Sequence, residues 1–342
     1  MKDAIVSKGP KVRVVESEMP TPEPEQLVIK VVVSGSNPKD WKVPEWLNEE
    51  ANTGDDIAGI VHAVGDKVWE FKPGDRVASF HEMRTKGGSY AEYALGWQHT
   101  TFHLSKNVSF EDAATIPLAA MTAAIGLHIR LGLPSHWTPA TEPTPLVVYG
   151  GASAVGAFAI KLAQKSNIHP IIAVAGHGIP YVETLLERSK GDSIVDYRNG
   201  DDAVVQGLKQ ALAGRKLEYA FDATSEKNSY ANICKVLEPT GKITLVLPGK
   251  NYEGIPETVQ QSITSVGDAH GKQKDFAYAY FRLMARGLDE GWFKPHPAEV
   301  VPRGLEGVEM ALRNLKEGKA SAVKYVFRIA ETPGVQSSQL SG

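Results

Sequence analysis

The chain has 342 residues, with 37 Lys+Arg against 40 Asp+Glu and a formal net charge of −3. This balance argues against a nucleic-acid or membrane-surface binder, because such proteins usually carry a basic excess. The single cysteine, Cys234, excludes an internal disulfide and a cysteine-rich zinc site. We expect about two domains from the length. We also expect a cytoplasmic location, because no signal peptide or apolar run of roughly 18–20 residues is evident.

The first third of the chain alternates short apolar runs with glycine and proline turns, in residues 26–38, 56–80 and 87–95. Many short strands of this kind predict a small β-barrel or sandwich. An Ala-rich helical segment follows at 110–132, and a Pro- and Thr-rich linker at 134–145 separates it from the next part of the chain.

Strands and helices then alternate, which predicts βαβ units and a doubly wound parallel sheet of the Rossmann type. The expected strands are 146–151, 170–176, 193–197, 217–223 and 242–247, and the clearest helices are 153–166 and 181–190. The end of the chain adds helices at 274–291 and 304–318 and a strand at 322–329. We therefore expect a first domain over 1–124, a nucleotide-type domain over 125–267, and a return over 268–342 that completes the first domain and ends in a flexible tail.

A glycine-rich turn between the strand 146–149 and the following helix has the context of a dinucleotide-binding fingerprint. Gly151 is expected to allow the tight turn and Gly156 close helix–strand packing, while Ser153 takes the place of the middle glycine. The helix N-terminus would offer free amides to a pyrophosphate. The alternative is a glycine-rich turn in an ordinary βαβ unit. The expected cofactor contacts are Gly151, Ala152, Ser153, Ala154, Val155 and Gly156.

The next strand indicates which nicotinamide cofactor is preferred. NAD-binding proteins place an acid at its end, where it binds the ribose 2′-hydroxyl. Here the strand ends in Gly176-His177-Gly178, and no acid follows until Glu183. We therefore expect NADPH, with Gly176, His177 and Tyr197 at the 2′-phosphate and Arg198 within reach. Alternatively, His177 is a solvated loop histidine, and Tyr197 only packs against its neighbours.

Several motifs together resemble the medium-chain dehydrogenase/reductase superfamily over about residues 1–330. They are Gly54-Asp55-Asp56-Ile57-Ala58-Gly59, Phe71-Lys72-Pro73-Gly74-Asp75-Arg76-Val77, Gly88-Ser89-Tyr90-Ala91-Glu92-Tyr93 and the loop Gly151–Gly156. The resemblance implies a GroES-like β-barrel domain and a Rossmann domain, with the active site in the cleft between them. The segment Gly35–Trp41 is most similar to zinc-free quinone oxidoreductases and fungal ToxD-like trans-acting enoyl reductases.

Departures from the zinc alcohol dehydrogenases exclude a metal in this interpretation. Asn37 stands where those enzymes carry a catalytic cysteine, and Asp55-Asp56 where they carry a His-Glu pair. The histidines His81, His99 and His103 do not fall at the family's ligand positions. We therefore expect no bound metal.

The resemblance also suggests site residues. Asn37 would lie beside the nicotinamide, bound to a ribose hydroxyl or the substrate oxygen, and Lys39 is a second candidate donor. Asn37→Ala is expected to slow catalysis with little effect on the fold, because the site reads as a turn. Thr122 and Leu247 are expected to contact the cofactor. Alternatively, Asn37 only belongs to an Asn-Pro turn, and Lys39 is a solvated loop lysine. Thr122 would then be a helix-interior threonine that bonds its own backbone.

These observations predict an NADPH-dependent, zinc-independent reductase of an activated C=C bond in an enone, quinone or enoyl thioester. Two rivals remain: a trans-acting enoyl reductase whose substrate arrives on a polyketide synthase carrier domain, and a non-catalytic NADPH-binding protein. We also expect a homodimer, because the segment 259–266 is predicted to form an exposed edge strand beyond the strand ending at Leu247.

Overall fold

The computed structural model describes residues 1–336, which form two compact units. Unit 1 comprises Met1–Leu118 together with the chain from Gly267 onward, and unit 2 is Ala119–Val266. The boundaries expected at 124 and 267 lie within six residues and one residue of these divisions. The last residues of the expected flexible tail, 337–342, lie outside the described residues.

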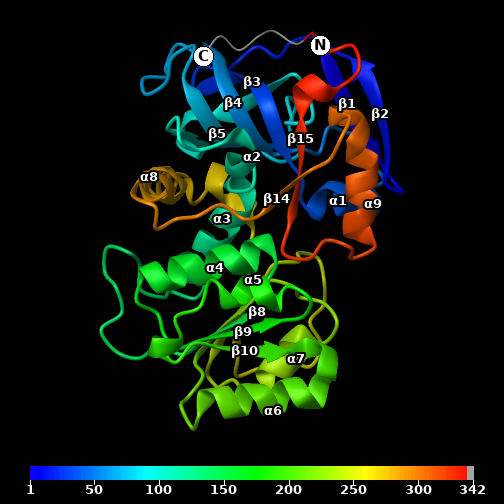
Figure 1. Cartoon of the computed structure of the whole chain (residues 1–342). Coiled ribbons are helices and arrows are strands. Elements are labelled where there is room, and N and C mark those ends of the chain that lie inside the picture. The colour runs from blue at the N-terminus through cyan, green and yellow to red at the C-terminus, as the bar shows by residue number, and fades with distance from the viewer. Residues whose placement is uncertain (337–342) are drawn as a thin grey trace. The chain divides into compact units, whose positions relative to one another are not determined.

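Unit 1 is built on a mainly antiparallel sheet with the strand order β14-β15-β3-β4-β5-β7, in which β6 also pairs with β3 and only β14 and β15 are parallel (Figure 1). A separate hairpin pairs β1 with β2. The late strand β15 is antiparallel to the early strand β3, so the two ends of the chain share one sheet. The bounds are β1 Lys2–Ser7, β2 Lys11–Glu16, β3 Gln26–Gly35, β4 Asp56–Val64, β5 Arg76–Phe80, β6 Tyr93–Trp97, β7 Thr101–His103, β14 Ala298–Val300 and β15 Lys324–Arg328.

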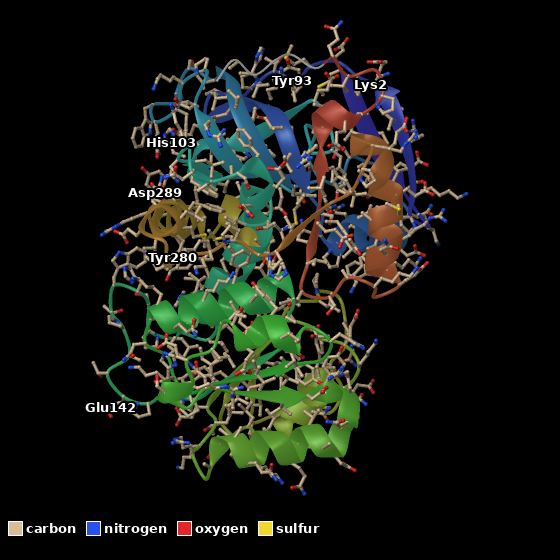
Figure 2. All side chains as sticks on the ribbon, in the orientation of Figure 1. Lys2, Tyr93, His103, Glu142, Tyr280 and Asp289 are labelled. Carbon is tan, nitrogen blue, oxygen red and sulfur yellow. The ribbon has the colours of Figure 1, made fainter. Side chains whose placement is uncertain are left out.

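Helices α2 and α8 pack against this sheet, and α1 and α9 pack against the β1–β2 hairpin. On α8, Tyr280 is buried and Asp289 is exposed, and Figure 2 labels both residues on this helix. The helix ends at Gly291, whose φ of 79° is the left-handed conformation that glycine adopts without strain. The bounds are α1 Lys39–Leu47, α2 Phe110–Ala113, α8 Lys274–Glu290 and α9 Val308–Lys316.

The core of unit 1 joins residues from both ends of the chain. Leu27 and Ile29 of β3 are fully buried in one apolar cluster with Phe327 of β15. The ring of Tyr90 meets the ring of Phe327 edge to face, with centroids 5.5 Å apart. Burial of this apolar surface is what holds the returning segment on the N-terminal sheet.

Unit 2 is a six-stranded parallel sheet with the order β10-β9-β8-β11-β12-β13. In chain order within the unit this is 3-2-1-4-5-6, the arrangement of a Rossmann fold, with its switch point between β8 and β11. Helices α4 and α5 cover one face and α6 and α7 the other (Figure 1). The bounds are β8 Leu146–Tyr149, α4 Ala154–Lys165, β9 Ile171–Ala175, α5 Ile179–Glu183, β10 Ser193–Asp196, α6 Asp201–Leu212, β11 Tyr219–Asp222, α7 Ser229–Cys234, β12 Lys242–Leu245 and β13 Gln260–Ile263.

Two predicted helices differ from the observed ones. The helix expected at 181–190 is the short α5, which ends at Glu183 with the amides of Thr184 and Leu185 bound three residues back, to Tyr181 and Val182. The helix expected at 110–132 is divided into α2, α3 (Pro117–Ala124) and a π-helical segment, Ile125–Arg130. Pro117 begins α3, which fits the preference of proline for the first helical turn.

The same stretch, Phe110–Arg130, is long and apolar enough to cross a membrane by length and composition alone. This differs from the expectation that no segment approaches that length. However, 83% of its apolar window is buried inside the structure, as in the core helix of a soluble protein. The stretch is therefore weak evidence for a membrane span.

Candidate functional site

Asn37 lies between β3 and α1 and is only 4% exposed. Its backbone N–H donates to Asp40 Oδ2 over 2.7 Å, across the start of α1. The sequence predicted a turn here, whereas the structure continues directly into a helix whose first residue is Lys39. Asn37 is therefore held in a buried position and not on a solvated loop.

A buried network surrounds the Asn37 side chain. Its Nδ2 donates to Asp56 Oδ2 over 2.6 Å. Lys324 Nζ donates to the same carboxylate oxygen over 2.5 Å and to Asn37 Oδ1 over 3.1 Å. Asp56 Oδ1 accepts the backbone N–H of Leu118 over 2.7 Å. Sequence reasoning missed Lys324 because it lies far along the chain, on β15, and no local pattern marks it.

Lys39, the second predicted donor, is fully engaged. Its ammonium pairs with Asp40 Oδ1 over 2.9 Å and with Asp55, and it donates to the backbone oxygen of Thr53. Burial opposes its charged form, but the two carboxylates raise the pKa of Lys39 above its ordinary value. The ammonium is thus held inside the protein by two carboxylates and one backbone carbonyl. The geometry therefore favours Asn37 over Lys39 as the donor.

Two further side chains complete this cluster. Tyr90 donates to Asp40 Oδ2 over 2.5 Å, and His81 Nδ1 lies 2.8 Å from Asp55 Oδ1. Burial raises the pKa of Asp40 to about 6, while Lys39 and His81 outweigh burial and lower the pKa of Asp55. The cluster therefore holds carboxylates of unlike acidity around one lysine.

These residues do not fit a catalytic zinc. At the family's ligand positions, Asn37 and Asp56 bind Lys324, and Asp55 binds Lys39. Ammonium groups thus already neutralise the carboxylates at these positions, Asp55 and Asp56, which a cation would need as ligands. Within residues 1–336, no group of three or more His, Cys, Asp or Glu side chains could hold a metal ion.

In unit 2, the glycine loop joins β8 to α4 as predicted, but its tight turn is at another residue. Gly150 has a φ of 80°, the left-handed region, whereas Gly151 does not lie there. A Cβ on Gly150 would also meet Thr224 Oγ1 at 2.5 Å. The role given to Gly151 therefore belongs to Gly150, because the chain must reverse directly after the last strand residue.

The start of α4 is shaped for an anion. Ser153, in the middle glycine position, caps the helix by accepting the Gly156 N–H over 3.1 Å. The first-turn amides of Ala154 and Val155 have no carbonyl one turn earlier in the helix to bind. A Cβ on Gly156 would lie 2.2 Å from the Gly150 oxygen, so only glycine allows this close approach. The loop therefore fits the pyrophosphate of a dinucleotide.

The predicted 2′-phosphate residues are brought together at the end of β9. A Cβ on Gly176 would lie 2.6 Å from the Tyr197 ring, so the ring rests on this glycine, and His177 is exposed beside it. Arg198 makes a bidentate ion pair with Asp196, from Nε to Oδ1 and from Nη2 to Oδ2, at the end of the neighbouring strand β10. Sequence reasoning missed this acid, because only the sheet register places Asp196 beside the end of β9.

The end of β11 carries further polar groups that sequence reasoning missed. Asp222 Oδ1 accepts the amides of Thr224 and Ser225 over 3.0 and 2.8 Å, and Ser229 Oγ donates to Oδ2 over 2.5 Å. Burial raises the pKa of Asp222 to about 6. Position at the carboxyl end of a parallel strand was the signal that could have identified this group.

The two remaining predicted contacts lie in separate elements. Leu247 follows β12, and its carbonyl accepts the Tyr252 hydroxyl over 2.7 Å. Thr122 lies in α3 and is 6% exposed. Gly150–Gly156, Gly176 and Leu247 follow the carboxyl ends of β8, β9 and β12 in one parallel sheet, the edge at which a dinucleotide binds in this fold.

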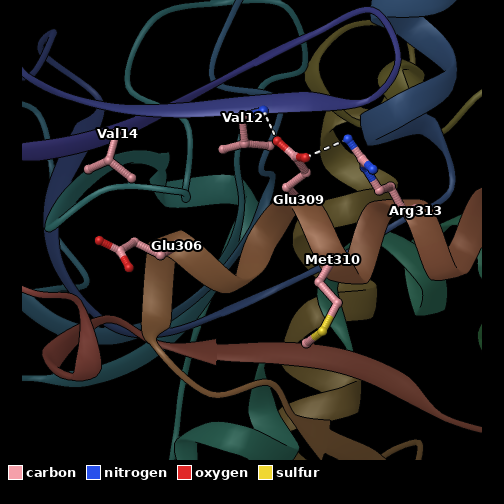
Figure 3. Close-up of a pocket in the computed structure, with 6 residues that line it drawn as sticks. All are labelled: Val12, Val14, Glu306, Glu309, Met310 and Arg313. Atoms are coloured by element: carbon pink, nitrogen blue, oxygen red, sulfur yellow. Dashed lines mark hydrogen bonds and ion pairs between the residues drawn. The ribbon is translucent and has the colours of Figure 1, made fainter.

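A pocket of about 660 Å³ opens elsewhere on unit 1, between β2 and α9 (Figure 3). None of the predicted site residues lines it. Its Glu309 carboxylate accepts the Val12 N–H over 2.8 Å and pairs with Arg313 over 2.6 Å. The Val12 bond joins α9 to the hairpin, and the Arg313 pair lies within the helix. The site is therefore assigned from the polar networks and not from this pocket.

Comparisons with known proteins fit this geometry. The model of the alcohol dehydrogenase GroES-like domain matches residues 23–106. The trans-enoyl reductase fsr4 of Gibberella fujikuroi is 49% identical over 312 residues, which cover 90% of this chain and 92% of that protein. The resemblance stated from the motifs is thereby confirmed.

Solved structures agree on the fold. The CurK enoyl reductase superposes with a TM-score of 0.78 at 20% identity, covering 95% of this chain and 98% of its own. Mycobacterial Rv1454c complexed with NADPH gives a TM-score of 0.76 at 19% identity, covering 95% and 99%. The expected combination of a GroES-like domain and a Rossmann domain is confirmed.

Proposed function

The chain belongs to the trans-enoyl reductases of the medium-chain dehydrogenase/reductase superfamily, and we propose that it uses NADPH to reduce the C=C bond of an α,β-unsaturated thioester. The observation that carries the proposal is the 49% identity to a trans-enoyl reductase over nine-tenths of the chain. The protein is an oxidoreductase, and the rival of a non-catalytic binding protein loses its support.

The cofactor would be held by unit 2. The amides of Ala154 and Val155 at the start of α4 fit its pyrophosphate, and Gly156 leaves room for it. His177 and Tyr197 would contact the 2′-phosphate, supported by the absence of an acid in the loop 176–178. When bound, the nicotinamide supplies the hydride for the reduction.

Asn37 would act on the substrate carbonyl. Its Nδ2 has two hydrogens, of which Asp56 takes one, so the second is available to a substrate oxygen. Hydride addition at Cβ moves negative charge to that oxygen, and a preorganised donor stabilises the enolate. An amide does not ionise an alcohol as a divalent cation does, so reduction of an activated alkene suits this site better than alcohol oxidation. Proton transfer to Cα from a side chain or water completes the reduction.

We further propose that the thioester is carried by a polyketide synthase. The support is the relative's name, which describes an enoyl reductase that acts in trans. A free small enone or quinone is the alternative substrate, and the same Asn37 donor would serve it.

The test is NADPH oxidation measured with enoyl thioesters of pantetheine, with the same acyl groups on a carrier domain, and with primary alcohols and NADP⁺. We expect turnover with the thioesters and a higher kcat/KM for the carrier-bound form. Turnover of alcohols alone would overturn the proposed reaction. Equal kcat/KM for free and carrier-bound thioesters would overturn the trans-acting part.

A further inference from the structure

Lys324 lies in the returning strand β15, yet its ammonium reaches the start of α1 from the far end of the sequence. The register Val326↔Gly35 places β15 beside the end of β3. A Cβ on Gly35 would lie 3.1 Å from Lys324 Cε, so this glycine leaves space for the lysine stem. Lys324 is only 4% exposed, and its charge is compensated within the protein by Asp56.

The contacts of Lys324 fix the direction of the Asn37 amide. An ammonium can only donate hydrogen bonds, and a carboxylate can only accept them. Asn37 therefore satisfies Lys324 and Asp56 in one orientation, with Oδ1 toward the lysine and Nδ2 toward the carboxylate. The alternative orientation would set an N–H against the ammonium and an oxygen against the carboxylate. The second Nδ2–H then has a defined direction.

Lys324 also balances the charge behind this donor. Asp56 is fully buried, and its negative charge lies directly beside Asn37. An uncompensated carboxylate there would oppose the negative charge that develops on a substrate oxygen bound to Asn37. The ammonium 2.5 Å from Asp56 removes that repulsion.

From this geometry we propose that Lys324 is a positioning residue of the reductase, which fixes the donor direction of Asn37 and neutralises Asp56 behind it. The proposal rests on the proposed function, because the oriented N–H is assigned to the substrate carbonyl. Lys324 itself acts through Asn37 and is not assigned a contact with substrate.

The test separates positioning from a merely structural ion pair. Lys324→Met leaves Asp56 buried without its counter-ion, so we expect both thermal stability and kcat to fall, kcat by about 10²-fold. The double variant Lys324→Met/Asp56→Asn removes the buried charge and should recover most of the lost Tm. The Leu118 N–H, which binds Asp56 Oδ1 in the wild type, should hold the oxygen of the amide introduced by Asp56→Asn. The NH2 of that amide then faces Asn37 and favours the reversed orientation of the Asn37 amide. We therefore expect kcat of the double variant to stay within about threefold of the single variant.

A structural role predicts the opposite pattern. If kcat returns together with Tm in the double variant, the proposal is wrong. NADPH affinity should stay within about threefold in both variants, because the residues assigned to its pyrophosphate and 2′-phosphate lie in unit 2. The matched control is Lys242→Met, a strand lysine whose Nζ donates to the Leu131 oxygen over 3.4 Å. It should leave kcat unchanged.

A second readout does not depend on turnover. In protein labelled with ¹⁵N-asparagine, the two Nδ2 protons of Asn37 should give separate signals in the wild type, assigned by their loss in Asn37→Ala. In the double variant these signals should shift and broaden as the amide turns. Unchanged signals would overturn the positioning role. If wild type reduces no enoyl thioester but the signals change as expected, the proposed function fails and the fixed orientation stands.

Discussion

The sequence alone identified Asn37 as a candidate, but only the fold shows which side chains bind it. The motif comparison identified it as the occupant of a metal-ligand position, and the structure surrounds it with Asp56 and Lys324. The sequence could not reveal the lysine, because it lies 287 positions from Asn37 and only the pairing of β15 with β3 brings them together. The expectation that Asn37 lies in a tolerant turn is wrong, since the residue is buried.

Asn37→Ala should therefore lower both activity and stability. Loss of the donor to the enolate is expected to reduce kcat by about 10²-fold. Loss of a buried hydrogen-bonding group is expected to lower the free energy of unfolding by about 1–3 kcal/mol. Steady-state kinetics and urea unfolding measure the two effects. The control is Asn52→Ala, whose amide binds Asp3 and the Gly88 oxygen, and which should keep its kcat. Full kcat in Asn37→Ala would remove Asn37 from the mechanism.

The contribution of Asp222 to the free energy of unfolding should decrease as pH rises. Burial raises its pKa in the folded protein from 3.8 to about 6. Between these values the folded state holds a proton that the unfolded state has lost, so the contribution of Asp222 to stability decreases as pH rises from about 4 to 6. Asp222→Asn removes this contribution.

The free energy of unfolding of wild type minus that of Asp222→Asn should thus fall by about 1–3 kcal/mol between pH 4 and pH 7. Urea unfolding at both values measures the difference. The side chain introduced by Asp222→Asn keeps an oxygen for the amides of Thr224 and Ser225. The wild-type and substituted side chains are therefore nearly isosteric. A difference that rises with pH would contradict the buried, proton-holding carboxyl.

At the scale of elements, the sequence predicted strands better than helix ends and turns. The buried runs that became β8 and β9 are apolar and rich in β-branched residues, which is a strong local signal. Helix α1 was not predicted, because a segment containing Pro38 and Pro44 reads as a turn. The turn glycine was placed at Gly151, since a motif gives spacing but not φ.

The expected preference for NADPH over NADH depends on residues in the loop after β9. His177 is exposed beside the Gly176–Tyr197 contact, and the nearby Asp196 is neutralised by Arg198. We therefore expect NADPH to bind more tightly than NADH. His177→Asp should weaken NADPH binding by roughly tenfold through repulsion of the 2′-phosphate and spare NADH.

Fluorescence titration of both cofactors measures these dissociation constants. The control is His103→Asp, an exposed histidine in unit 1, which should change neither. Equal affinity of the wild type for NADPH and NADH would remove the basis of the preference.

At the scale of the whole molecule, the sequence predicted two domains and the return of the chain to the first. The reason is that the pattern of expected strands and helices changes near residues 110 and 268. It predicted an edge strand at 259–266, and β13 does lie at the edge of the Rossmann sheet. Whether that edge pairs with a second copy is a property of the surface, which local patterns do not encode.

We expect a homodimer formed through β13. Gln260 and Thr264 donate their N–H groups into the sheet, so the alternate residues Gln261 and Ile263 face the open edge. Gln261→Pro removes an outward N–H without breaking a bond inside the sheet and should give monomers. Light scattering should show twice the 37.0 kDa chain mass for the wild type. A wild-type mass near 37.0 kDa would rule this dimer out.

The most direct test of the account follows the hydride itself. Reduction of an enoyl thioester with NADPH deuterated at the transferring position of C4 should place one deuterium at Cβ of a saturated thioester, as seen by NMR and mass spectrometry of the product. Deuterium at the carbonyl carbon of an alcohol or aldehyde product, with the C=C bond intact, would contradict the account.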